Sequence, residues 1–236
     1  MKKAAFGLYI AFTIALMIWG YYQAIYSAPD DAMQGEISHI FYYHVPIAML
    51  SFLFLAISLA GSIGYLAFRR SSPDRAQIAD AWALAGAEIG VIYCTVVLTT
   101  GPIWGRRAWG IWWTWDWRLT TTLILWLIYV SYLLLRRFAA GPQMQTLAAV
   151  LSIFGALDVP IVYMSNRIFR TQHPAPVFGG GADSGLKDPR MLAAWEWNIL
   201  AWFAWGILIL ALRYIVERRQ QKIAALEAQD ALNAIN

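Results

Sequence analysis

The 236-residue sequence contains few charged residues and a single cysteine. Only 14 % of its side chains are charged and 60 % are hydrophobic, which is too apolar for an ordinary soluble domain. Cys94 has no second cysteine for a disulfide or a CxxC redox pair, so we expect a small buried hydrophobic residue. A glycine-rich nucleotide-binding motif is also missing, so the chain by itself is not expected to hydrolyse ATP. These absences leave a polytopic membrane protein as the predicted class.

Six apolar segments are long enough to cross a membrane, which takes about 20 residues for roughly 30 Å of hydrocarbon. The breaks between them carry arginine pairs, prolines and glycines, which are typical of turns and loops. We therefore expect an all-α protein with six transmembrane helices in one domain of residues 1–236. An even number of spans places both termini on one side. The expected spans are approximately 4–23, 46–68, 80–101, 119–138, 146–165 and 194–216.

The distribution of lysine and arginine predicts the orientation of these spans. A cytoplasmic N-terminus places eleven of the 18 basic residues inside, and the first external loop then has none. We therefore predict an N-in, C-in topology with an uncleaved first helix, in which residues 217–236 continue the last helix into the cytoplasm. The net charge of +4 reports this orientation and not nucleic-acid binding. The seven basic residues left outside are Arg106, Arg107, Arg118, Arg167, Arg170, Lys187 and Arg190.

The external segment between the third and fourth spans, residues 102–118, is unusually rich in tryptophan. The run WGRRAWGIWWTWDWRLT, residues 104–120, holds six tryptophans, three arginines and one aspartate, far denser than an interfacial aromatic belt requires. In a helical conformation one face would carry Trp109, Trp112, Trp113 and Asp116. An extended conformation would instead place on one side Trp113, Trp115 and Trp117. Either geometry gives an aromatic shelf suited to a flat macrocycle, whose carboxylates the arginines would pair.

Asp116 has two interpretations at the sequence level, and both can hold together. It directly precedes the fourth span, where an aspartate favours the N-cap position. It also lies among the tryptophans, where its carboxylate can face a ligand.

All three histidines lie at the predicted external side. His39 and His44 precede the second span, and His173 follows the fifth. Pro46 suits the first turn of a helix, which would put the His44 imidazole at the outer mouth of span two. A single histidine there is commonly a helix-start hydrogen bonder. His44 and His173, however, leave different helices on the same face, so the two rings can converge as iron ligands.

The run WGIWWTWDWRLT, residues 109–120, resembles the tryptophan-rich signature of the haem-handling proteins of cytochrome c biogenesis. Within that group the short length, the six spans, HVP before span two and RTQHP after span five are similar to the cytochrome c maturation protein C family. The resemblance covers nearly the whole chain. It implies a haem site on the external face with His44 and His173 as axial ligands. The platform residues that it implies are Trp109, Trp112, Trp113, Trp115, Asp116 and Arg118.

The resemblance also implies a function and partners. The chain would be a bacterial inner-membrane protein, not an enzyme, that holds haem b non-covalently on the periplasmic face and delivers it to a periplasmic haem chaperone of the CcmE type. It would act beside ATP-binding-cassette subunits and a small membrane subunit, similar to CcmA, CcmB and CcmD. Two positions depart from the family pattern. His39 stands where a basic arginine or lysine is expected, and Trp117 where a small residue is expected.

Two other functions fit parts of the sequence. A membrane enzyme acting on a lipid-linked phosphate would use the external arginines and tryptophans to hold phosphate and tail. It would be favoured by a paired acidic metal motif such as DDxxD, and Asp30 and Asp31 are the only adjacent acids. A purely structural subunit of a membrane assembly is the second alternative.

Two acidic residues lie inside predicted spans, Glu88 in the third and Asp158 in the fifth. A charge at the centre of a membrane costs roughly 2.5–3.5 kcal/mol on insertion scales. We therefore expect each carboxylate to face another helix or a cavity. Asp158 can support the ligand pocket or pair with a polar neighbour.

Overall fold

The computed structural model describes residues 2–139, 141, 143–169, 171–173, 186 and 188–234. Six helical segments in this part are long and apolar enough to span a membrane, which confirms the predicted all-α, six-span fold. Arg170, Lys187 and residues 174–185 of the Gly/Pro-rich loop lie outside the described residues. The helices are α1 (Lys2–Tyr22), η1 (Gln23–Ser27), η2 (Glu36–Ile40), α2 (Phe41–Phe68), α3 (Pro73–Trp109), α4 (Trp117–Phe138), α5 (Met144–Ala156), α6 (Asp158–Ile168) and α7 (Pro189–Asn233).

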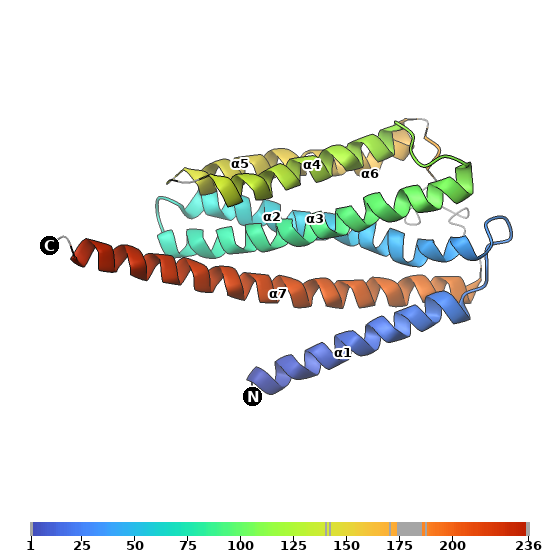
Figure 1. The fold of residues 1–236 in the computed structure, drawn as a ribbon, viewed down its shortest axis with the longest axis horizontal. Helices are drawn as coiled ribbons and strands as arrows, with labels where there is room; N and C mark the ends of the chain where they lie inside the picture. The colour runs from blue at the N-terminus through green and yellow to red at the C-terminus, as the bar shows by residue number, and fades with distance from the viewer. Residues whose placement is uncertain are drawn as a thin grey trace.

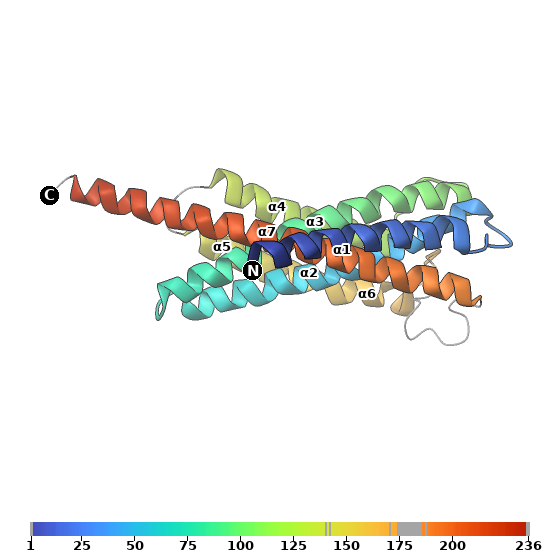
Figure 2. The same cartoon turned by 90° about the horizontal axis from the view of Figure 1, so that it is seen from below.

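The helices run roughly side by side along the long axis of the molecule (Figure 1). α4, α5 and α6 lie on one side of the α2–α3 pair, and α7 lies on the other side with α1 packed outside it (Figure 1). Both termini point toward one end, and the connections from α1 to α2 and from α3 to α4 lie at the opposite end (Figure 1). The second view shows α7 continuing well past the other helices (Figure 2).

α2 and α3 form the closest helix pair, because glycines remove the side chains at their crossing. A Cβ at Gly86 of α3 would lie 2.7 Å from the Phe54 carbonyl oxygen and 2.7 Å from the Ser58 nitrogen of α2. A Cβ at Gly61 of α2 would lie 2.5 Å from the Ala83 nitrogen of α3. Small residues let membrane helices approach backbone to backbone, where packing and not hydrophobicity drives their association. The two helices form the rigid wall of the site described below.

α1 packs mainly against α7, the last helix of the chain. The Tyr9 hydroxyl donates a 3.0 Å hydrogen bond to the Ala204 carbonyl, and the Asn198 side chain donates a 2.9 Å bond to the Gly20 carbonyl. Asn198 is only 2 % exposed, so its side-chain amide needs acceptors within the protein, which are the Gly20 and Ala194 carbonyls. The two bonds between the helices fix α1 along the outer face of α7.

Several charged side chains inside the bundle form ion pairs across helices. Glu88 of α3 forms an ion pair with Arg213 of α7, which confirms that Glu88 faces another helix. Nearer the terminal end, Arg136 of α4 makes two hydrogen bonds to Asp80 of α3, at 2.5 and 2.9 Å. These pairs join α3, α4 and α7 at the end of the bundle away from the histidines.

Asp158 begins α6, directly after the turn at Leu157 that divides the fifth span into α5 and α6. Its Oδ2 atom is buried and has no hydrogen-bond partner among the described residues. It does not line the cavity described below, so the structure gives no support for a role of Asp158 in the ligand pocket.

The start of α2 differs from the prediction. Helical structure begins at Glu36 with η2 and continues into α2, so Pro46 lies inside the helix and not in its first turn. The proline removes only one backbone hydrogen bond. The turn ahead of it is held by tertiary packing, because Tyr42 is 1 % exposed and packs against Ala24 and Trp195. His44 therefore lies on a helix, which corrects the prediction that it precedes the second span.

Candidate functional site

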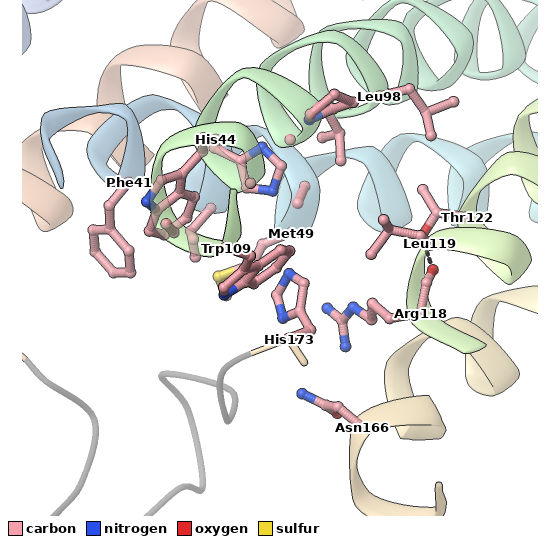
Figure 3. A pocket seen from close by; sticks show the side chains of 18 of the residues that line it. Phe41, His44, Met49, Leu98, Trp109, Arg118, Leu119, Thr122, Asn166 and His173 are labelled. Carbon is pink, nitrogen blue, oxygen red and sulfur yellow. Dashed lines mark hydrogen bonds between the residues drawn. The ribbon is translucent and has the colours of Figure 1, made fainter. Parts of the chain in front are cut away.

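A cavity of about 430 Å³ lies at the end of the bundle opposite the termini. It is lined by α2, α3, α4 and α6, by residues that precede α2 and by residues that follow α3 and α6 (Figure 3). Pockets for small molecules and cofactors have volumes of about 300–1,000 Å³, so this cavity is of ligand size. Six of the eight predicted site residues line it, and Trp115 and Asp116 do not. The six are His44, Trp109, Trp112, Trp113, Arg118 and His173.

The tautomer of His44 is set by a threonine of the neighbouring helix. His44 Nδ1 lies 2.8 Å from Thr100 Oγ1, and that hydroxyl donates its only proton to the Val96 carbonyl at 2.7 Å. Thr100 must therefore accept the hydrogen bond, so Nδ1 carries the proton. The lone pair is then on Nε2, as in a histidine prepared to bind a metal through that nitrogen.

Two further residues of α3 hold the His44 ring, which is only 6 % exposed. Gly101 packs next to it, and a Cβ there would lie in ordinary van der Waals contact, 3.4 Å from the His44 Cε1 atom. Trp104 packs edge-on against it, with ring centroids 5.8 Å apart, and donates a 2.6 Å hydrogen bond to Gln34 Oε1. Thr100, Trp104 and Gln34 were not among the site residues predicted from the sequence. Trp104 could have been found as the first tryptophan of the rich run, whereas Thr100 and Gln34 carry no distinctive pattern.

The tryptophan segment is neither one helix nor one extended strip. α3 continues eight residues past its expected end and stops at Trp109, where Gly110 takes the left-handed conformation with φ 78°. Residues 111–116 then follow without regular structure until α4 begins at Trp117. The prediction of one helix through the motif is therefore wrong, because the glycine ends the helix inside the motif and breaks its periodicity.

The tryptophans consequently face different surroundings. Trp109 folds back over Gly105, where a Cβ would lie 3.2 Å from its ring. Trp113 lines the cavity, and its buried Nε1 has no hydrogen-bond acceptor among the described residues. Trp112 lines the mouth and is 60 % exposed, and Trp115 is 75 % exposed outside it. Trp109 and Trp113 are thus the inner aromatic walls.

Asp116 is the N-cap of α4, as one of its two interpretations predicted. Its Oδ1 accepts a 2.9 Å bond from the Leu119 backbone nitrogen, and its Oδ2 accepts a 2.6 Å bond from the Thr171 hydroxyl. Both of its oxygens are engaged in hydrogen bonds, and Asp116 does not line the cavity.

Arg118 brings a positive charge to the cavity from the first turn of α4. Its guanidinium points into the space beside His173 (Figure 3). The guanidinium donates a 3.4 Å hydrogen bond to the Tyr163 carbonyl. None of the ion pairs among the described residues includes Arg118. A guanidinium that borders a cavity and forms no ion pair is suited to binding a carboxylate that enters the cavity.

His173 follows α6 and faces the cavity from the side opposite α2. Its ring lies beside the Trp109 indole and the Arg118 guanidinium, and the His44 ring borders the same space (Figure 3). Two histidines separated by most of the chain are thus brought to one cavity. His39 is not part of its lining, and its Nε2 lies 3.1 Å from Asp30 Oδ1.

The described residues offer no alternative centre for a metal ion. No three histidine, cysteine, aspartate or glutamate side chains gather among them as a metal-binding cluster. Cys94 is a buried free cysteine that lines the inner part of the cavity, which confirms the prediction of a small buried residue.

The fold and the site define a class, that of six-span helical membrane proteins with an aromatic cavity bordered by two histidines and an arginine. The family profile described as "Heme exporter protein C" matches residues 1–231. Heme exporter protein C of Bradyrhizobium diazoefficiens is 34 % identical over 223 residues, which cover 92 % of this chain and 81 % of that protein. The Escherichia coli K12 protein of that name is 30 % identical over 217 residues, which cover 89 % and 78 %. The chain belongs to the haem exporter protein C family, which confirms the resemblance seen in the sequence.

Proposed function

We propose that the chain binds haem b in this cavity, on the periplasmic side of the inner membrane, and delivers it to a periplasmic haem chaperone. Membership of the haem exporter protein C family gives the coarser role, haem handling for cytochrome c biogenesis by a multi-pass membrane protein. The observation that carries the proposal is the convergence of His44 and His173 on one aromatic cavity.

The chemistry of the cavity fits haem as cargo. The Nε2 lone pair of His44 is available because Thr100 occupies Nδ1, and imidazole nitrogen is a common axial ligand of haem iron. Trp109 and Trp113 offer flat apolar surfaces to the macrocycle. Arg118 offers a guanidinium to a propionate. The sequence has no CxxCH motif, which is consistent with haem held without a covalent bond and passed on.

The orientation is part of the proposal. The turns at the terminal end of the bundle each hold an arginine pair, Arg69–Arg70 and Arg136–Arg137. Arginine-rich short loops remain in the cytoplasm, so the opposite end with the cavity faces the periplasm. There the site is accessible to a CcmE-like chaperone. We further propose that the chain works within a complex of CcmA-, CcmB- and CcmD-like subunits and has no catalytic residue of its own.

The absorption spectrum of the detergent-purified protein tests the ligand assignment. Wild type is expected to show the spectrum of haem with two histidine ligands, and a protein carrying both His44→Ala and His173→Ala is expected to lose it. His39→Ala is the matched control, because the third histidine lies outside the cavity and should leave the spectrum unchanged. A double variant that retains the wild-type spectrum, or a wild type that stays colourless with ample haem, would contradict the proposal.

Thr100 supports a second, smaller prediction. Thr100→Val keeps the shape of the side chain but removes the hydrogen-bond acceptor for His44 Nδ1. A hydrogen bond of this kind contributes about 1 kcal/mol, so the haem affinity should fall roughly fivefold. Haem titration followed by absorbance measures the change. Thr100→Ser should restore the affinity, and equal affinities for the valine and serine variants would disprove the role of the hydroxyl.

A further inference from the structure

The segment that carries His173 is fastened to the start of α4 by contacts made away from the cavity lining. The Thr171 hydroxyl donates a 2.6 Å hydrogen bond to Asp116 Oδ2. The backbone N–H of His173 donates a 3.1 Å bond to the same hydroxyl oxygen. Neither Asp116 nor Thr171 lines the cavity, yet together they connect α4 to the backbone of a residue that does.

The direction of these bonds follows from the protons available. A threonine hydroxyl has one proton and two lone pairs, and a carboxylate only accepts. Thr171 must therefore give its proton to Asp116, which leaves a lone pair directed at the His173 N–H. The bond to the carboxylate is charge-assisted and stronger than a bond between neutral groups. Asp116 thus sets the direction of the Thr171 hydroxyl, and the hydroxyl fixes the position of the His173 backbone.

A second contact reinforces the same connection. The Trp117 ring stacks on the Phe169 ring with centroids 4.2 Å apart and an angle of 17° between the planes. Trp117 follows Asp116 at the start of α4, and Phe169 follows the last residue of α6. The stack therefore holds the beginning of the His173 segment, and the hydrogen bonds hold its end.

We propose that Asp116 and Thr171 are positioning residues, which orient His173 in the cavity through the hydroxyl and make no contact with haem themselves. The inference rests on the proposed function, in which His173 is an axial ligand. Asp116 of the tryptophan motif then supports iron coordination indirectly, by holding the axial histidine His173 in place. Its Oδ1 atom caps helix α4, and its Oδ2 atom binds Thr171 of the histidine segment.

The variants that test this separate positioning from helix capping. Asp116→Ser keeps a good N-cap for Leu119 but is too short to hold Thr171 as well. Thr171→Val removes the hydroxyl, and Thr171→Ser retains it. The spectroscopic readout is the ratio of haem with two histidine ligands to haem with one, from absorption and electron paramagnetic resonance. The thermal unfolding midpoint without haem is the structural readout.

We expect Thr171→Val and Asp116→Ser each to lower that ratio about tenfold, as for the loss of one hydrogen bond to a charged group. Thr171→Ser should return it to the wild-type value, and the unfolding midpoints should all stay close to wild type. Thr171→Val added to His173→Ala should have no further effect. Wild-type ratios in Thr171→Val and Asp116→Ser, beside a loss in His173→Ala, would overturn the positioning role alone. No change in His173→Ala would overturn the proposed function as well.

Discussion

Asp80→Ala is expected to destabilise the helix bundle by about 3–5 kcal/mol, because it leaves a buried arginine without its main partner. The Arg136 and Asp80 side chains are 7 % and 3 % exposed, and they form a two-pronged ion pair. After the substitution the nearest remaining carboxylate is that of Glu217, 3.7 Å from Arg136. The lost interaction joins α3 to α4 and, through Glu217, to α7. Unfolding in detergent, followed by circular dichroism, measures the loss.

The matched control removes both charges together. Replacing a buried ion pair by apolar residues is often neutral or stabilising, whereas removing one partner is costly. The double variant Asp80→Leu, Arg136→Leu should therefore recover most of the stability that Asp80→Ala loses. Gln145 also donates a 2.8 Å bond to Asp80, so part of the loss should persist. A double variant less stable than Asp80→Ala would contradict this expectation and show that the ion pair itself stabilises the bundle.

Gly86→Ala is expected to force the closely packed helices α2 and α3 apart. The new Cβ would meet backbone atoms of α2 at 2.7 Å, and backbone cannot rotate out of the way as a side chain can. Overpacking costs about 1–3 kcal/mol where side chains can adjust, so we expect about 3 kcal/mol or more here. Because α2 carries His44 and α3 carries Thr100, the displaced helices should also lengthen that contact and weaken haem binding.

Gly7→Ala provides the comparison, since nothing lies within 4 Å of a Cβ built at that position of α1. Alanine there should leave the stability unchanged or raise it slightly, because alanine favours helices more than glycine does. Both variants are measured by unfolding in detergent and by haem titration. Equal stability of the two alanine variants would mean that α2 and α3 separate at little cost.

The sequence was sufficient to predict the six helices, because long apolar runs are the strongest signal that a membrane protein carries. It also placed at one end His44, His173, Trp109, Trp113 and Arg118, since successive spans alternate in direction and every second connection lies on the same side. These predictions depend on composition and order along the chain. Both can be read without knowing how side chains pack.

The parts that escaped prediction depend on tertiary contacts. Nothing local shows that Tyr42 packs well enough to keep a helix ahead of Pro46, or that Gly110 and not Pro102 ends α3. Thr100 looks like any threonine of a membrane helix until His44 of α2 is placed against it. Residues that contact each other across helices have no fixed spacing along the chain, so a single sequence gives no pattern by which to recognise them.

The packing of α1 against α7 has a consequence for the order of synthesis. Asn198 follows Gly20 by 178 residues and Ala204 follows Tyr9 by 195, so α1 binds a helix that is made much later. At translation rates of about 5–20 residues per second, α1 waits roughly 10–40 s in the membrane before α7 exists. The central helices α2 and α3 can pair during this interval. The packing of α1 against α7 therefore comes late, after α2 and α3 have paired to form the wall of the cavity.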